Sequence, residues 1–227
     1  MNTEVIDVVA NLARVQAEIA AAATAAHRSP DEVHLVAVSK THGPERVRPV
    51  LTAGHRLFAE NRVQEAEHKW PDLRLEYPDV KLHLIGPLQS NKAHKAVLLF
   101  DVIETVDSGK LARRLARIMA DENRPLPVFL QVNTGAEPQK AGVAPKETED
   151  FLSFCRDECG LQVVGLMCIP PLEEEPALHF ALLRELAGGL GLTNLSMGMS
   201  ADYEKAIAYG ATHVRVGTAI FGAREAY

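Results

Sequence analysis

Short apolar runs alternate with amphipathic segments along almost the whole chain. Residues 4–26 carry apolar side chains at three- and four-residue spacing, which predicts an amphipathic helix. Eight apolar runs follow, and most of them lack polar alternation, as expected for parallel strands that are covered on both faces. These runs lie at 34–38, 56–59, 81–85, 102–105, 128–132, 163–167, 194–197 and 213–216.

Segments with helical periodicity separate the runs. They lie near 44–53, 61–70, 90–99, 108–122, 145–158, 174–190 and 200–209. Repeated strand–helix units favour an α/β fold in which eight strands close into a (β/α)8 TIM barrel, preceded by one extra N-terminal helix. An open doubly wound sheet is the structural alternative, but no glycine-rich dinucleotide fingerprint follows the first run.

Composition and charge exclude several classes of function. The chain has 227 residues, with 24 Lys plus Arg against 30 Asp plus Glu, so its net charge is −6. An acidic chain without a basic stripe is not typical of nucleic-acid binding. No run of 18 apolar residues and no secretory leader pattern is present. We therefore predict a cytoplasmic protein that has no membrane span and binds no nucleic acid.

Cysteine and histidine spacing gives no support for a metal site. Cys155, Cys159 and Cys168 are too few for a disulfide framework and fit a reducing compartment. Cys155 and Cys159 could share a helix face, but no His or further Cys pair accompanies them. The nine histidines form no zinc-binding motif. We predict that the protein holds no metal.

Lys40 is the most reactive residue expected at the barrel mouth. The C-terminal ends of barrel strands converge on one face, and Lys40 follows the first run almost directly. Partial loss of solvation there favours the neutral amine, which can form an imine with a carbonyl compound. A lysine that only extends from the barrel into solvent is an equally good interpretation of this residue alone.

The loops after the last two runs have the composition of an anion site. Gly198 and Ser200 follow the seventh run, and Gly217 and Thr218 follow the eighth. Small residues let backbone N–H groups approach a phosphate, and the hydroxyls add donors. Service in a tight turn is the less favoured interpretation of each glycine alone. Together with Lys40, these loops would hold a ligand that carries both an aldehyde and a phosphate, and pyridoxal 5'-phosphate (PLP) is such a ligand.

Six motifs in order resemble a known family. From about residue 5 to the C-terminus the chain is similar to the pyridoxal phosphate homeostasis proteins, the YggS/PROSC family. The motifs lie at Leu35–Thr41, Glu60–Glu65, His83–Lys92, Gly165–Pro171, Leu195–Asp202 and Val214–Gly222. The resemblance implies a PLP fold-type III barrel like the N-terminal domain of bacterial alanine racemase, with PLP held as an internal aldimine on Lys40.

The resemblance also implies roles for individual residues. It places Asn61 near the cofactor, Met167 in the pocket wall, Arg215 against the pyridine nitrogen, and Ser200, Gly217 and Thr218 around the phosphate. A guanidinium beside the ring nitrogen disfavours protonation there, which weakens the cofactor as an electron sink. The chain departs from the family at Ala59, where glycine is usual, so the geometry near Asn61 is expected to differ slightly.

Chain length bears on the choice between a carrier and an enzyme. Fold-type III racemases and decarboxylases add a C-terminal β domain. In this chain, residues 1–227 are all expected to belong to one barrel domain. We therefore predict a monomeric, non-catalytic protein that stores, buffers or delivers PLP, affects amino-acid and keto-acid balance, and supplies PLP-dependent apo-enzymes. The alternative is a small racemase or lyase with Lys40 as base and Tyr203 or His42 as the second acid or base. A Schiff-base aldolase acting on a sugar phosphate is a third interpretation.

Overall fold

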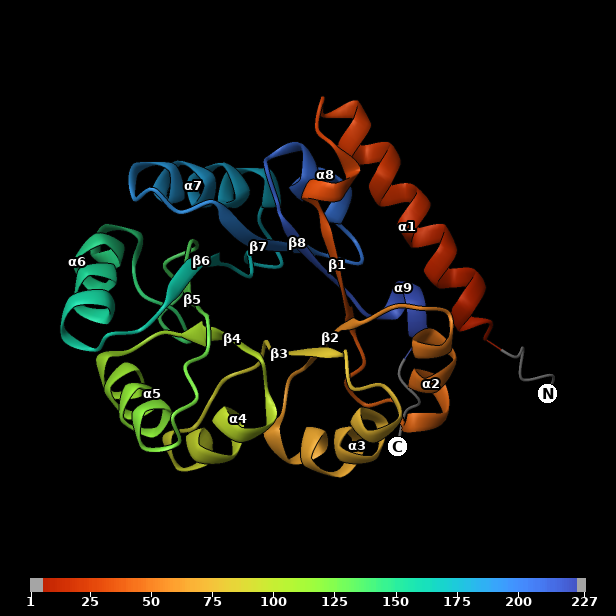
Figure 1. Cartoon of the computed structure of the whole chain (residues 1–227). Helices are drawn as coiled ribbons and strands as arrows, with labels where there is room; N and C mark the ends of the chain where they lie inside the picture. Colours follow the sequence, from red (N-terminus) through yellow and green to blue (C-terminus); the bar gives the residue numbers. More distant parts are fainter. Residues whose placement is uncertain (1–5, 224–227) are drawn as a thin grey trace.

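Eight parallel strands close into a barrel in sequence order, with the last strand paired to the first. The computed structural model describes residues 6–223 (Figure 1). The strands are β1 (His34–Val38), β2 (Leu57–Glu60), β3 (Lys81–Leu84), β4 (Val102–Val106), β5 (Val128–Gln131), β6 (Val163–Met167), β7 (Asn194–Met199) and β8 (His213–Val216). The closed order confirms the predicted TIM barrel and excludes the open sheet.

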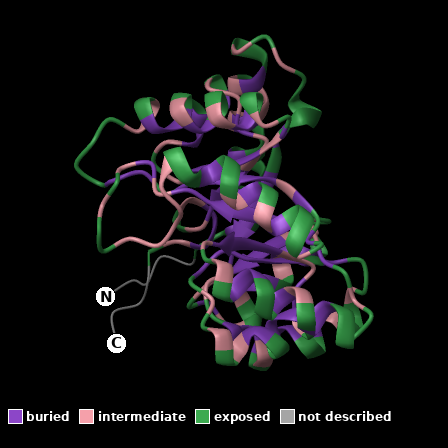
Figure 2. Ribbon diagram, turned by 90° about the vertical axis from the view of Figure 1, so that its left-hand side faces the viewer, coloured by how far each residue is buried: buried purple, intermediate pink, exposed green. Residues whose placement is uncertain are grey.

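Helices surround the barrel on its outside, with their buried faces toward the strands (Figures 1 and 2). They are α1 (Val8–Ala25), α2 (Pro44–Thr52), α3 (Val63–Glu76), α4 (Ala93–Leu99), α5 (Gly109–Asp121), α6 (Thr148–Ser153), α7 (Pro176–Gly189), α8 (Tyr203–Ala208) and α9 (Thr218–Phe221). The extra N-terminal helix is thus α1; residues 4 and 5 of its predicted range lie outside the described residues. Across residues 6–223, none of the helices has the length and apolarity needed to cross a bilayer.

The segment predicted as one helix at 145–158 consists of three shorter pieces. A 3-10 turn at Pro145–Glu147 leads into α6, and a π-helical turn at Phe154–Glu158 follows α6. Pro145 begins the first piece, where its fixed φ suits a helix start. The three pieces differ in residues per turn, so the single 3.6-residue period expected from the sequence is only locally correct.

Strand side chains divide between an outer apolar layer and the barrel interior. Phe58 of β2 faces outward and packs against Trp70 of α3, with ring centroids 5.1 Å apart, and both side chains are fully buried. Val36, Val38, Ala59 and Ile85 form a separate apolar cluster. Ala59 is therefore accommodated as part of this cluster, and its methyl group leaves the β1–β2 pairing of Val38 with Ala59 intact.

Histidines occupy the opposite end of the interior, near the start of the strands. The His213 ring lies 5.0 Å from that of His34, 6.1 Å from His83 and 5.4 Å from Phe129, measured between centroids. Burial lowers the pKa of His213 to about 4; the charge of Glu104 opposes this shift, whereas those of His83, His34 and Arg215 add to it. His213 is therefore neutral in the folded protein at physiological pH.

His213 makes stability depend on pH. Its pKa is about 4 when folded and near 6.5 when unfolded, so the unfolded chain binds the extra proton between these values. The free energy of unfolding should therefore fall by up to about 3 kcal/mol as the pH decreases from 6.5 to 4. We expect His213→Gln to remove this part of the pH dependence in urea unfolding. His68→Gln, at an exposed position of α3, is the control, and an unchanged slope in His213→Gln would contradict the prediction.

Candidate functional site

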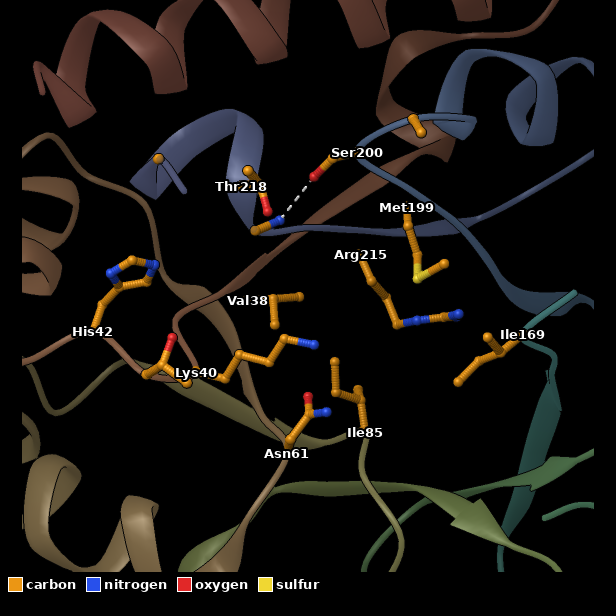
Figure 3. Close-up of a pocket in the computed structure, with 14 residues that line it drawn as sticks. Val38, Lys40, His42, Asn61, Ile85, Ile169, Met199, Ser200, Arg215 and Thr218 are labelled. Atoms are coloured by element: carbon orange, nitrogen blue, oxygen red, sulfur yellow. Dashed lines mark hydrogen bonds between the residues drawn. The ribbon is translucent and has the colours of Figure 1, made fainter. Parts of the chain in front are cut away.

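A cavity of about 290 Å³ opens at the C-terminal ends of the strands, where β1 and β8 meet (Figure 3). This volume is at the lower end of the range for small-molecule pockets. The cavity wall includes six of the residues singled out from the sequence: Lys40, Asn61, Ser200, Arg215, Gly217 and Thr218. These residues follow four different strands, so barrel closure is what brings them together.

Lys40 extends into the middle of the cavity from the end of β1 (Figure 3). The next residue, Thr41, has a φ of +66°, which is unusual for a residue with a branched side chain. The Thr41 N–H donates to Glu65 Oε1 at 2.5 Å. This contact with α3 holds the turn and so directs the Lys40 side chain inward.

A buried ion pair on the outer side of β1 and β2 supports the same turn. Lys69 Nζ of α3 donates to Glu60 Oε1 and to the Ser39 carbonyl, each at 2.8 Å. The Ser39 hydroxyl and Trp70 Nε1 donate to the same Glu60 oxygen, at 2.6 and 3.1 Å. Burial raises the pKa of Glu60, although Lys69 and Ser39 act in the opposite direction. The residue before Lys40 is thus held through both its side chain and its carbonyl group.

The opposite wall carries hydroxyl and backbone N–H groups. Ser200 Oγ accepts from the N–H groups of Gly217 and Ala219 at 3.3 and 3.4 Å, and Thr218 stands beside Ser200 (Figure 3). A Cβ atom at Gly217 would lie 3.1 Å from the Val38 carbonyl oxygen, so a larger residue would disturb β1. Donors gathered in this way favour an anionic ligand group.

Helix α1 fixes this wall from outside. Asn11 and Arg14 donate to two backbone carbonyls of α9, at 3.1 and 3.0 Å. Tyr203 of α8 donates its hydroxyl hydrogen to Glu18 of α1. Tyr203 therefore does not line the cavity, whereas His42, the other residue considered as a second acid or base, does line it and stacks on Phe221 with centroids 5.4 Å apart.

Arg215 enters the cavity from β8 and is almost fully buried. Its Nη1 donates to Ser196 Oγ at 2.7 Å, and its Nη2 donates to the Cys168 carbonyl at 2.8 Å. Two hydrogen bonds to different strands fix the guanidinium plane. The site therefore offers a rigid cation on the side of the cavity where Met199 and Ile169 lie (Figure 3).

Asn61 contributes an unsatisfied acceptor. Its Oδ1 atom is buried and has no hydrogen-bond partner among the described residues, although the side chain lines the cavity. Buried polar atoms without partners are costly, so a ligand donor at this point would stabilise the site. Gly86 packs directly behind, where a Cβ would lie 2.1 Å from the Asn61 carbonyl oxygen.

Among the residues that the resemblance places around PLP, Met167 alone does not line the cavity. It is fully buried in β6, in register with Gln131 and Ser196. Ile169, two residues further along, lines the cavity instead, together with Val38, Ile85 and Met199. The sequence analysis did not predict this apolar wall. Side chains two residues apart along a strand face the same way, so the choice of Met167 could also have indicated Ile169.

Similarity to known proteins agrees with this geometry. The family model for the N-terminal domain of alanine racemase matches residues 10–225. The pyridoxal phosphate homeostasis protein of Pseudomonas aeruginosa is 46% identical over 222 residues, covering 95% of each chain. The Escherichia coli K12 protein of the same name is 40% identical over 228 residues, covering 96% of this chain and 97% of its own. The chain belongs to the pyridoxal phosphate homeostasis protein family.

Solved structures extend the family comparison. PipY from Synechococcus elongatus PCC7942, with PLP bound, superposes with a TM-score of 0.84 at 40% identity, over 95% of this chain and all of PipY. Alanine racemase from Clostridium difficile 630 gives a TM-score of 0.73 at 14% identity, over 97% of this chain but only 57% of its own length. The homeostasis protein family thus shares the fold-type III barrel with alanine racemase, as predicted.

Proposed function

We propose that this protein binds pyridoxal 5'-phosphate covalently through Lys40 and serves to store, buffer or deliver it in the cell. One observation carries the proposal: the Lys40 amine and a wall of hydroxyl and N–H donors face one another across a single cavity. PLP matches both sides, because its aldehyde condenses with a primary amine and its phosphate accepts several hydrogen bonds. The PLP-bound relative PipY supports this ligand.

The remaining residues fit the same ligand. Ser200, Gly217 and Thr218 would hold the phosphate, and the unpartnered Asn61 oxygen would accept a hydrogen bond from a donor of the bound ligand. Arg215 would lie against the pyridine nitrogen and discourage its protonation. We leave Met167 out of the direct contacts because it does not line the cavity.

We propose further that the protein does not turn over amino acids. A racemase or lyase needs a second acid or base beside Lys40, and Tyr203 hydrogen-bonds with Glu18 outside the cavity. His42 is then the residue on which the enzymatic alternative depends. A fixed cation at the ring nitrogen also weakens the electron sink that such an enzyme uses. The names of the related proteins refer to PLP homeostasis and support the carrier function.

The proposed location, recipients and oligomeric state rest on the sequence. We propose a cytoplasmic location, for which the three cysteines without a disulfide partner are in keeping. PLP-dependent apo-enzymes as recipients and a monomeric state are further parts of the proposal.

Visible spectroscopy and isotope exchange test the function together. Protein incubated with PLP and freed of excess ligand should be yellow, and borohydride reduction should fix the cofactor on the peptide that contains Lys40. The same sample should exchange no α-hydrogen of added amino acids for deuterium. A colourless protein that traps a sugar phosphate would replace the proposal with the aldolase, and rapid stereoselective exchange would replace it with the racemase.

A further inference from the structure

Four buried polar side chains form one continuous chain of hydrogen bonds beneath the cavity. Arg215 Nη1 donates to Ser196 Oγ at 2.7 Å, and the Ser196 hydroxyl donates to Glu104 Oε2 at 2.5 Å. Glu104 Oε1 lies 2.6 Å from His83 Nδ1. Glu104 and Ser196 are fully buried, and Arg215 and His83 are 3% and 4% exposed. The chain links β8, β7, β4 and β3 across the barrel interior.

Glu104 carries the negative charge in this chain. Burial alone would raise its pKa, but the hydrogen bond and charge of His83, together with the charge of Arg215, hold the pKa below its usual range. The titratable groups that face it come from β3 (His83) and β8 (Arg215 and His213), and His34 of β1 stands behind His213. His213 is neutral, so Glu104 is the carboxylate that balances Arg215.

The geometry at Arg215 leaves little freedom. A buried guanidinium is stable only when its charge is compensated and its N–H groups are bonded. Two of its nitrogens are occupied by Ser196 and by the Cys168 carbonyl. Its direction and effective charge toward a ligand are consequently set by groups that do not line the cavity themselves.

We propose that Glu104 is a positioning residue for cofactor binding, which acts through Ser196 to aim Arg215 and to offset its charge. The inference rests on the proposed function, since it concerns the contact of Arg215 with PLP. On this proposal, the polar residues of the barrel interior contribute to cofactor binding as well as to packing. The same chain of contacts explains why an acidic side chain stands buried in β4.

The pH titration of the bound cofactor reads out the charge at Glu104. The visible band of PLP-loaded protein reports a proton on Lys40 Nζ, and a nearby negative charge favours that proton. Glu104→Gln keeps the shape and removes the charge. At a separation on the order of 10 Å and an effective dielectric constant of about 20–40, the titration midpoint should fall by about 0.5–1 pH unit. Glu104→Asp keeps the charge and should bring the midpoint back toward the wild-type value.

Ser196→Ala tests the positioning step separately. It keeps the carboxylate but removes the bridge, so the midpoint should change little while PLP binds roughly several-fold more weakly. Thr148→Val is the control: Thr148 is a buried hydroxyl of α6, bonded to the Ala144 carbonyl, and the change should alter thermal stability only.

The outcomes distinguish a positioning role of Glu104 from a purely structural role and from failure of the proposed function. A Glu104→Gln protein that is less stable but keeps the wild-type midpoint and PLP affinity would show that Glu104 is structural only and would overturn the inference. If Glu104→Gln does not fold, unchanged PLP affinity in Ser196→Ala would overturn it equally. Failure of the wild-type protein to take up PLP would refute the proposed function, which is visible before any variant is compared.

Discussion

Replacing Lys40 with alanine is expected to abolish covalent uptake of PLP while leaving the barrel folded. The side chain is half-buried at the cavity and belongs to neither apolar cluster, so unfolding should change by no more than about 1 kcal/mol. The donor wall at Ser200, the Asn61 oxygen and the Arg215 contact would remain for the ligand. We expect the apparent affinity to fall on the order of 100-fold, which corresponds to about 2.7 kcal/mol.

Two variants accompany this measurement. Lys110→Ala removes an exposed lysine of α5 and should behave as the wild type. Lys40→Arg keeps a positive charge but lacks the primary amine, so it should also lack a borohydride-stable adduct. Mass spectrometry of reduced peptides and circular dichroism measure attachment and folding side by side. An adduct of normal yield in Lys40→Ala would place the attachment on another residue and contradict the assignment.

Gly86→Ala is expected to have the second large effect, on stability and binding together. The added Cβ would lie 2.1 Å from the carbonyl oxygen of Asn61 and 2.7 Å from its carbonyl carbon. Both are backbone atoms, so β2 and β3 must separate at their C-terminal ends before the methyl group fits. We expect a loss of about 2–3 kcal/mol in urea unfolding and weaker PLP binding, because the move displaces Asn61 from the cavity.

A second glycine provides the matched comparison. Gly188 lies in α7, and a Cβ there would meet no atom within 4 Å. Gly188→Ala should therefore raise the stability by about 0.5–1 kcal/mol through higher helix propensity. If Gly86→Ala proved as mild as Gly188→Ala, the close approach of the two backbones would not be a constraint on the site.

The barrel could be predicted from the sequence because its strands are short apolar runs with few competing interpretations. β1, β6 and β8 begin and end at the predicted residues, and β7 extends two residues further, to Met199. The segment at 145–158 was harder, since the π-helical turn after α6 leaves no distinct pattern of apolar positions. A change in residues per turn over so few residues is set by tertiary packing.

Site residues next to strand ends were predictable, and those that act through long-range contacts were not. Lys40 and Thr218 come together because the ends of parallel strands share one face. Ser196 and Glu104, by contrast, are 92 residues apart, and their contact depends on strand register and on which residues face inward. The Lys69–Glu60 ion pair spans only nine residues, but it was missed because it too depends on which way the side chains of β2 and α3 face. Met167 shows that prediction can also fail between close neighbours. Met167 does not line the cavity, whereas Ile169, only two residues further along, does.

The site lies at the seam of the barrel, where the first strand pairs with the last. This position determines when, during synthesis and folding, the site becomes complete. Contacts across the seam join residues about two hundred positions apart, as between Asn11 and Ile220, which are separated by 209 residues. Chain segments this distant meet only late in folding. A ribosome-bound chain that lacks β8 and α9 has Lys40 and Ser200 but lacks Arg215, Gly217 and Thr218. On the proposed function, the ability to hold PLP should therefore appear only once β8 and α9 have joined the barrel, and a chain that lacks them should not take up the cofactor.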